Sequence, residues 1–390
     1  MKKKFTLLTF VMVFALLAVA LTGCGGNKNY AANNTEFVIG VSGPLTGDAS
    51  IYGIAVQNGA QLAVDEINAA GGLNGVMFKL VALDDKHDAS NIATNFATLF
   101  EGGMQVSLGT VTTAPGLEFK TYAKDENVFF ITPSASGDAI AEFDNGFQMC
   151  FADGNQGAVA ADYVNSACAG QTIGIFYKSD DPYSQGIYKQ FMENLDSGIA
   201  TIETSFTDAT STDFSVQIDT LKDCSFIFMP IYYTPASLFM TQAIGIIADD
   251  AVYYGCDGLD GIENTEGFDI TAVPQEVSML SHFNSKATDG EAAAFIEKYV
   301  SKYGADTLNQ FGASAYDCVY AIYNAMKQAS EADSKAISVT MSAAELCSVL
   351  QPMFAGGNFH FAGVTGSDIS WADNGYVNKT AIKFIIKEAQ

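Results

Sequence analysis

The feature that most constrains the fold is a regular alternation of short apolar runs with amphipathic stretches, which begins at Phe37. Runs such as FVIGVSG and NVFFITP have the length and apolar content of strands in a buried sheet. Between such runs, apolar residues recur at helical spacing, as at Val56, Ala60 and Ala63, until Gly71 ends the stretch. This order of strands and helices predicts a parallel sheet with helices on both faces.

The same alternation restarts near residue 152, which indicates two units of one kind. GVSGPLTGDASIYG opens the first half and GIFYKSDDPYSQG opens the second; each predicts a strand, then a polar loop with Asp and Tyr, then a glycine at a helix start. After VSMLSHF, helices are expected over 291–303, 310–329 and 341–354, followed by a closing ISW…AIKFIIK pair of strands. We therefore expect an α/β fold with two Rossmann-like lobes, each built on a parallel sheet.

The N-terminal segment MKKKFTLLTFVMVFALLAVALTGC has the features of a secretory signal peptide, assigned to residues 1–23. Its apolar run, from Phe5 to Ala20, is shorter than the ~20 residues that a membrane-spanning helix needs, which disfavours a transmembrane anchor. The LTGC sequence resembles the bacterial lipobox, in which the cysteine is diacylated. That resemblance implies a lipid on Cys24, a polar tether over 24–35, and an extracytoplasmic protein held on a bacterial membrane, as on a Gram-positive surface, by this lipid only.

The composition narrows the class of partner. The formal net charge is −25, and all 19 basic residues are lysines. Such an acidic chain is disfavoured as a nucleic-acid binder and as a protein that adheres to anionic lipid. Because the sequence contains no arginine, a carboxylate ligand would have to be bound without a bidentate guanidinium group.

The remaining cysteines and the histidines give no sign of a metal or catalytic site. Six cysteines besides Cys24 are widely spaced; an exported protein could pair them, but buried free thiols are the favoured interpretation. The three histidines stand far apart, and neither GxGxxG nor GxxxxGK[ST] occurs, so no metal and no cofactor is expected. No nucleophile–base–orienter set is visible either, and we do not expect an enzyme.

In open α/β sheets ligands bind beyond the carboxyl ends of the strands, which here selects three loops in each half. In FFITPSASGD the apolar strand stops at Pro133 and gives way to Ser134, Ala135 and Ser136, small residues that let a ligand approach backbone N–H groups. The loop TVTTAP adds Thr113 and a helix start, which favours anions. The hydroxyls could instead cap helices, but two such loops together favour a carboxylate site.

The corresponding loops of the second half offer different chemistry, with Tyr183, Tyr232, Tyr233 and Asp257. A carboxylate at a strand end can bind an ammonium group, and tyrosines can line a cavity while offering hydroxyls. Asp257 could instead be an ordinary turn residue, since CDG is turn-like. A carboxylate bound by one lobe and an ammonium bound by the other imply a zwitterionic ligand, an α-amino acid.

Several segments in this order, IGVSGPLTGDASIYG, GAQLAVDEINAAGGLNG, LDDKHDA, FFITPSASGD and YGCDGLDG, resemble the type I periplasmic solute-binding proteins of the leucine/isoleucine/valine-binding kind. The resemblance covers roughly residues 36–390. It implies one lobe of 36–151 plus 280–360 and another of 152–279 plus 361–390, joined by a three-segment hinge. It also implies a monomer that captures a small-molecule ligand and presents it to an ABC permease complex.

The resemblance also implies the ligand-binding positions: loop residues for the α-carboxylate, an acid for the ammonium group, and aromatic walls for the side chain. In that order they are Thr113, Ser134, Ala135 and Ser136; Asp257; and Tyr52, Tyr183, Tyr232 and Phe311. There is one clear departure. The branched-chain archetype has a disulfide between the positions of His87 and Thr112, which this chain cannot form.

The leading interpretation is an extracytoplasmic substrate-binding protein of an ABC importer, with a branched-chain or another hydrophobic or aromatic amino acid as its ligand. A ligand-sensing receptor of the same fold is a second interpretation, which fusion to a signalling domain would support. A binder of an amide or an aromatic acid that lacks the ammonium group is a third. Replacing Asp257 with alanine should weaken an ammonium-bearing ligand but spare a plain acid.

Overall fold

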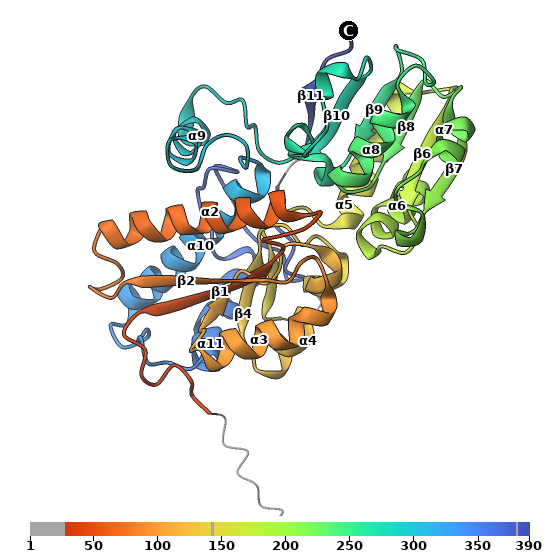
Figure 1. Ribbon diagram of the computed structural model, residues 1–390. Coiled ribbons are helices and arrows are strands. Elements are labelled where there is room, and N and C mark those ends of the chain that lie inside the picture. Colours follow the sequence, from red (N-terminus) through yellow and green to blue (C-terminus); the bar gives the residue numbers. More distant parts are fainter. Residues whose placement is uncertain (1–27, 142–143, 380) are drawn as a thin grey trace, which may run out of the picture.

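The computed structural model describes residues 28–141, 144–379 and 381–390, and the signal peptide and Cys24 lie outside these residues. The described chain forms two α/β lobes, which Figure 1 shows at the lower left and the upper right. The expected fold of two lobes with parallel-dominated sheets is confirmed. Within the described part, no helix combines the length and the apolar character that crossing a bilayer requires.

The first lobe is built on a five-stranded parallel sheet in the order β2-β1-β3-β4-β5. Strand β1 is buried along its whole length, as expected of a sheet with helices on both faces. The strands are β1 (Phe37–Gly43), β2 (Phe78–Asp84), β3 (Val106–Ser107), β4 (Phe129–Thr132) and β5 (Gly146–Gln148). The helices are α2 (Ser50–Ala69), α3 (Ile92–Glu101), α4 (Thr113–Asp125), α9 (Gly290–Tyr303), α10 (Gln310–Ala332) and α11 (Ala343–Phe354).

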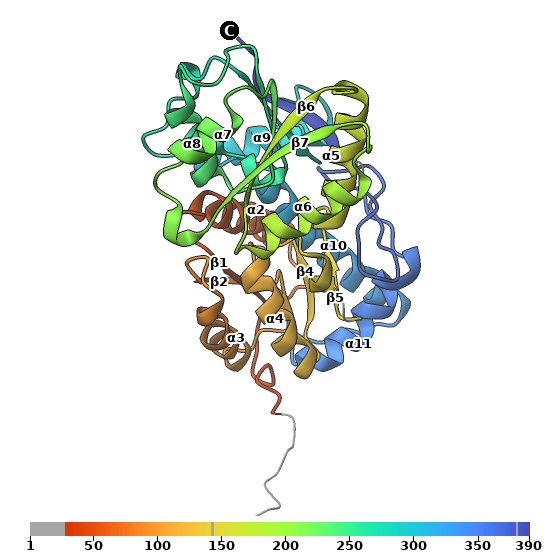
Figure 2. The same ribbon diagram turned by 90° about the vertical axis from the view of Figure 1, so that its right-hand side faces the viewer.

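The first lobe is assembled from segments that are far apart in the sequence. Helix α10 lies alongside α2, as both ribbon views show (Figures 1 and 2). The hydroxyls of Tyr316 and Tyr320 on α10 both donate to the Glu66 carboxylate on α2, at 2.7 and 2.9 Å. The late segment of the chain therefore completes the lobe that the first segment begins.

The second lobe has a six-stranded sheet in the order β11-β10-β9-β8-β6-β7, in which only the edge strand β11 is antiparallel. The expected ISW…AIKFIIK pair is wrong, because Trp371 bridges to Val377 while β11 pairs with β10. The strands are β6 (Thr172–Lys178), β7 (Ala200–Phe206), β8 (Phe226–Met229), β9 (Val252–Gly255), β10 (Glu276–Ser281) and β11 (Ile382–Lys387). The helices are α5 (Asp153–Ala167), α6 (Pro182–Asn194), α7 (Ser215–Leu221) and α8 (Tyr233–Ala243).

The segments that connect the lobes touch one another. The Phe151 ring meets the His282 ring edge to face, with centroids 5.0 Å apart, and Lys379 Nζ donates to Met149 O at 2.8 Å. These contacts join segments near 151, near 282 and near 379, in keeping with a three-segment hinge.

The contacts of Trp371 bear on where the chain passes between the lobes for the third time, which the sequence placed near residue 360. Trp371 Nε1 donates to Gln148 O on the first lobe, and its ring lies 4.7 Å from that of Phe354. Residues up to this point therefore pack with the first lobe. We propose that the chain crosses for the third time after Val377, before β11 begins at Ile382.

Candidate functional site

A small cavity lies where loops of the two lobes meet. Its loops follow β1, β3 and β4 of the first lobe and β6, β8 and β9 of the second, which is where open α/β sheets bind ligands. The residues that line it are Tyr52, Val111, Thr113, Ser134, Ser136, Tyr183, Tyr232, Asp257, Gly258 and Phe311. All the expected ligand-binding residues are thus brought together except Ala135, which is buried between the two serines and is not part of the wall.

The first-lobe wall is formed by neutral hydrogen-bonding groups. Thr113 is the first residue of α4, and the N–H groups in the first turn of a helix have no partner within the helix. The Thr113 hydroxyl is buried and makes no hydrogen bond with any described residue. Ser134 and Ser136 are also buried on this wall. A helix N-terminus beside an unpartnered hydroxyl can bind an anion.

The loop after β4 differs from the expected loop in one respect. Thr132 Oγ1 accepts hydrogen bonds from the backbone N–H groups of Ser134 (3.3 Å) and Ala135 (2.9 Å), and it donates to Thr110 O (2.9 Å). These two N–H groups are therefore occupied, and the expectation that they would face a ligand is not met. The hydroxyls of Ser134 and Ser136 are what this loop offers to the cavity.

The second-lobe wall carries a buried acid. Asp257 follows β9 directly and is only 2% exposed. Its Oδ1 accepts from the Tyr183 hydroxyl (2.7 Å), which itself accepts from Gly258 N (2.8 Å). Burial raises the pKa of Asp257 to about 6, because the ionised carboxylate loses its hydration. A cation in the cavity would stabilise the ionised form again.

Asp153 is a second buried acid, to which the sequence reasoning assigned no role. It opens α5, is 1% exposed, and neither carboxylate oxygen has a hydrogen-bond partner among the described residues. Burial raises the pKa of Asp153 well above its ordinary value; the nearby charge of Asp257 adds to the rise, and Ser136 opposes it. Only the restart of the alternation at FADG pointed to this position. The backbone N–H of Asp153 donates to Ser136 O at 2.8 Å, so this acid lies behind the loop after β4 and is not part of the cavity wall.

Four aromatic rings enclose the rest of the cavity. Tyr183 and Tyr232 are stacked, with centroids 4.5 Å apart and planes at 12°. Tyr52 meets Phe311 edge to face at 5.1 Å, and its hydroxyl donates to Gly258 O on the opposite lobe. These rings give apolar sides to a cavity whose ends are polar.

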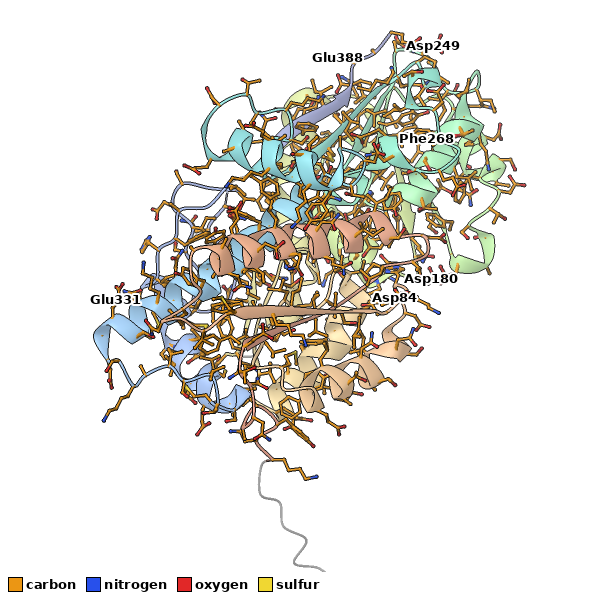
Figure 3. All side chains as sticks on the ribbon, turned by 60° about the vertical axis from the view of Figure 1, so that its left-hand side comes forward. Asp84, Asp180, Asp249, Phe268, Glu331 and Glu388 are labelled. Atoms are coloured by element: carbon orange, nitrogen blue, oxygen red, sulfur yellow. The ribbon has the colours of Figure 1, made fainter. Side chains whose placement is uncertain are left out.

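Direct hydrogen bonds hold the lobes together around this cavity. Thr234 Oγ1 of the second lobe donates to Asp48 O of the first at 2.7 Å. Asp260 Oδ2 of the second lobe accepts from Gln310 N, at the start of α10, at 2.9 Å. Burial raises the pKa of Asp260 to about 7. The lobes are closed over the site, so the walls lie close enough to contact one small ligand together. Figure 3 shows side chains filling the region between the lobes.

The positions of the disulfide in the branched-chain archetype are in contact here through a different bond. His87 Nδ1 and Thr112 Oγ1 are 2.9 Å apart, so a hydrogen bond joins the two loops. Cys150, Cys168, Cys224, Cys256, Cys318 and Cys347 are all free and buried, which confirms the interpretation of buried thiols. The described residues contain no group of three side chains suited to hold a metal ion.

Known proteins share the sequence pattern and the architecture of this chain. The family model described as periplasmic binding protein matches residues 36–366. The leucine-, isoleucine-, valine-, threonine- and alanine-binding protein of Pseudomonas aeruginosa is 27% identical over 343 residues, which cover 85% of this chain and 87% of that protein. The isoleucine complex of LivJ, a branched-chain amino acid transporter substrate-binding protein of Streptococcus pneumoniae, is similar with a TM-score of 0.76 at 26% identity, over 90% of this chain and 98% of LivJ.

A more distant neighbour shows the fold alone. The benzoate complex of an ABC transporter solute-binding protein from R. palustris has a TM-score of 0.75 at 17% identity, over 90% of this chain and 93% of that one. The match of the family model to most of the chain, together with the relatives above, confirms the resemblance seen in the sequence. The family is one of solute-binding proteins and not of enzymes. This chain belongs to the periplasmic binding proteins of type I, in the leucine/isoleucine/valine-binding group.

Proposed function

We propose that this protein captures an α-amino acid between its lobes and delivers it to an ABC permease. The observation that carries the proposal is the opposite polarity of the two ends of one small cavity. At one end stand the unpartnered Thr113 hydroxyl and the N-terminus of α4; at the other stands the buried carboxylate of Asp257. A zwitterion matches both ends at once.

In this proposal each end of the ligand compensates a buried group of the protein. The α-carboxylate accepts from Thr113 Oγ1 and from the hydroxyls of Ser134 and Ser136, and it lies at the positive end of the α4 dipole. The ammonium group lies against Asp257. An isolated buried charge is costly, so the ligand and this acid stabilise one another. Ligand binding favours the closed form because only that form supplies both ends of the cavity.

The side chain of the ligand would lie among Tyr52, Tyr183, Tyr232 and Phe311, which suits a branched-chain or another hydrophobic or aromatic amino acid. The relatives with amino-acid ligands in their names support this class. We propose further that Cys24 carries the lipid that holds the protein, as a monomer, on the outer face of the cell membrane, where a permease receives the ligand.

A thermal-shift screen of the mature protein without its signal peptide tests the proposal. A ligand at 100 times its dissociation constant adds about 2.7 kcal/mol to the unfolding free energy, which is a readily measured shift. At least one α-amino acid should stabilise the wild type, and Ser136→Ala and Asp257→Ala should each reduce that shift without unfolding the protein. Unchanged affinity in both variants, or no shift with any amino acid, would contradict the proposal.

An aromatic acid without an ammonium group is the second candidate, because tyrosine and phenylalanine rings make up much of the wall. The same screen separates the two. An aromatic acid should keep its affinity in Asp257→Ala, whereas an amino acid should lose most of it. Benzoate and 4-hydroxybenzoate are suitable probes.

A further inference from the structure

A second and larger cavity, of about 280 Å³, opens between the lobes beside the small one. Asp48 and His87 of the first lobe line it, together with Lys178 and Asp181 of the second. Tyr232 lines both cavities, so the two adjoin at this side chain. None of the other expected ligand-binding residues lies on the wall of the large cavity.

The Tyr232 side chain lies between the two cavities and forms part of both walls. One contact of its ring is the stack with Tyr183, and another is an edge-to-face contact with His87, at 5.3 Å and 87°. Its hydroxyl is buried and has no hydrogen-bond partner among the described residues. A buried polar atom without a partner is destabilising. The hydroxyl is therefore suited to accept a hydrogen bond from a ligand that lies along the partition.

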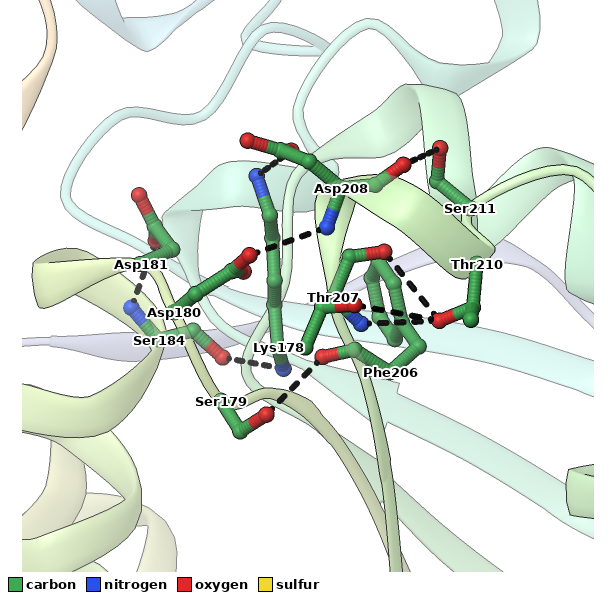
Figure 4. A network of polar contacts seen from close by, with 10 residues as sticks. All are labelled: Lys178, Ser179, Asp180, Asp181, Ser184, Phe206, Thr207, Asp208, Thr210 and Ser211. Carbon is green, nitrogen blue, oxygen red and sulfur yellow. Dashed lines mark hydrogen bonds and ion pairs between the residues drawn. The ribbon is translucent and has the colours of Figure 1, made fainter.

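Asp181 is a buried acid on the wall of the large cavity, only 4% exposed. It caps helix α6: its Oδ2 accepts from Ser184 N at 2.9 Å. The other oxygen accepts no hydrogen bond from the described residues, and Figure 4 shows it pointing away from the cap. Burial raises the pKa of Asp181, and the cap and Lys178 oppose the rise. Half of this carboxylate is thus free to contact a cation.

The charges around the large cavity favour a cation. Its lysine, Lys178, forms an ion pair with Asp208 at 2.5 Å, drawn in Figure 4, and so is already matched by an acid. His87 is largely neutral near pH 7, because burial lowers its pKa. Asp48, Asp181 and Asp208 give the wall three acids against this one lysine, so acids remain in excess. A positive group entering this space is attracted, and a negative one is repelled.

We propose that the large cavity is a distal subsite for α-amino acids whose side chain extends past the aromatic rings, and that among these it favours one whose side chain ends in a cation. The amino-acid head occupies the small cavity, the aliphatic stem packs on the Tyr232 ring, and the terminal cation contacts the free oxygen of Asp181. The inference rests on the proposed function, because the head must be held by Asp257.

The test compares ligands that differ only in the terminal charge. Calorimetric titration of the mature protein with lysine and with norleucine, and with arginine and citrulline, measures the preference directly. We expect the wild type to bind the cationic member of each pair about tenfold or more tightly, the size of a partly buried charge pair. Asp181→Asn keeps the helix cap, since asparagine is an equally good N-cap, and should abolish that preference while leaving leucine affinity unchanged.

Asp180→Asn is the matched control, because Asp180 is the adjacent acid, is exposed, and is not on the cavity wall. It should keep the preference for the cationic ligand. Equal binding of lysine and norleucine by the wild type, or a preference that survives in Asp181→Asn, would overturn the inference while leaving the proposed function intact. Binding of no amino acid at all would remove both.

Discussion

The two walls of the small cavity offer a ligand different interactions. The first-lobe wall offers neutral donors, Thr113 and two serines, at the N-terminus of α4. The second-lobe wall offers Asp257, a buried carboxylate held by a tyrosine hydroxyl. The first wall is stable without a ligand because its groups carry no net charge, whereas the second stores buried negative charge that a ligand must compensate.

The difference follows from the composition of the chain. With no arginine, the chain cannot bind a carboxylate by a guanidinium fork, so a helix terminus and hydroxyls take that role. Acids are abundant, and Figure 3 shows them also at the far ends of both lobes, as with Glu331 and Glu388. What distinguishes Asp257 is its burial: exposed acids are screened by water, and a buried one is not.

The largest expected effect comes from removing the charge of the second wall. Asp257→Asn should weaken binding of an α-amino acid by about 2–5 kcal/mol, since one partner of a buried charge pair is lost. The ligand-free protein should not become less stable, because the charged form of Asp257 is disfavoured by burial. Calorimetric titration and thermal unfolding measure the two effects. Asp249→Asn, an exposed acid on the same lobe, is the control and should change neither.

Removing the neutral donor of the first wall should have a smaller effect. Thr113→Val keeps the shape but loses the hydroxyl, and should weaken binding by about 1.5–3 kcal/mol, the contribution of a hydrogen bond to a charged group. Because this hydroxyl has no partner in the protein, ligand-free stability should not fall. Thr132→Val is the contrasting variant: its hydroxyl bonds Ala135 N and Thr110 O, so chemical denaturation should show a loss of stability. A stability loss in Thr113→Val would show that the first wall is structural.

The pH dependence of ligand affinity and of stability tests the second wall without a mutation, because only that wall carries a titrating acid. With a pKa of about 6, Asp257 is roughly one-tenth ionised at pH 5, so affinity for an ammonium-bearing ligand should be about tenfold lower at pH 5 than at neutral pH. Ligand-free stability should change in the opposite direction. The folded pKa lies above the ordinary 3.8, so this contribution is complete below 3.8 and is lost as pH rises through about 6. The pH dependence of affinity and that of ligand-free stability should both be weaker in Asp257→Asn. If they equal those of the wild type, Asp257 is not the group that titrates.

The smallest expected effect concerns the contact between the lobes. Asp260 of the second lobe accepts from Gln310 N at the N-terminus of α10, so its charge favours closure through the helix dipole. Asp260→Asn keeps an acceptor and loses the charge, and should weaken ligand binding by about 0.3–1 kcal/mol. Stopped-flow fluorescence should show faster ligand release with little change in association. Slower association alone would indicate that Asp260 attracts the ligand and does not stabilise the closed form.

Much of the fold could be predicted from the sequence, because strands buried on both faces must be apolar and the helices between them must be amphipathic. Elements with a weak pattern were missed or misplaced. Strand β5 has three residues, too few to show a period, and the ISW segment forms an isolated bridge at Trp371 in place of a strand. The later third crossing that we propose could not be located from the sequence, since nothing in it shows that Trp371 donates to Gln148 O.

The loops that meet can be inferred from the pattern of strands and helices, since parallel strands bring their carboxyl ends to one edge, and the lack of arginine requires another way to bind a carboxylate there. Which polar atoms remain free is seen only in the folded chain: Thr132 occupies two N–H groups of its loop, while Thr113, Tyr232 and Asp153 keep unpartnered atoms. Hydrogen-bond saturation and burial depend on neighbours from other segments, whereas hydrophobic periodicity is local. For the same reason the large cavity beside Tyr232 exists only where the two lobes close.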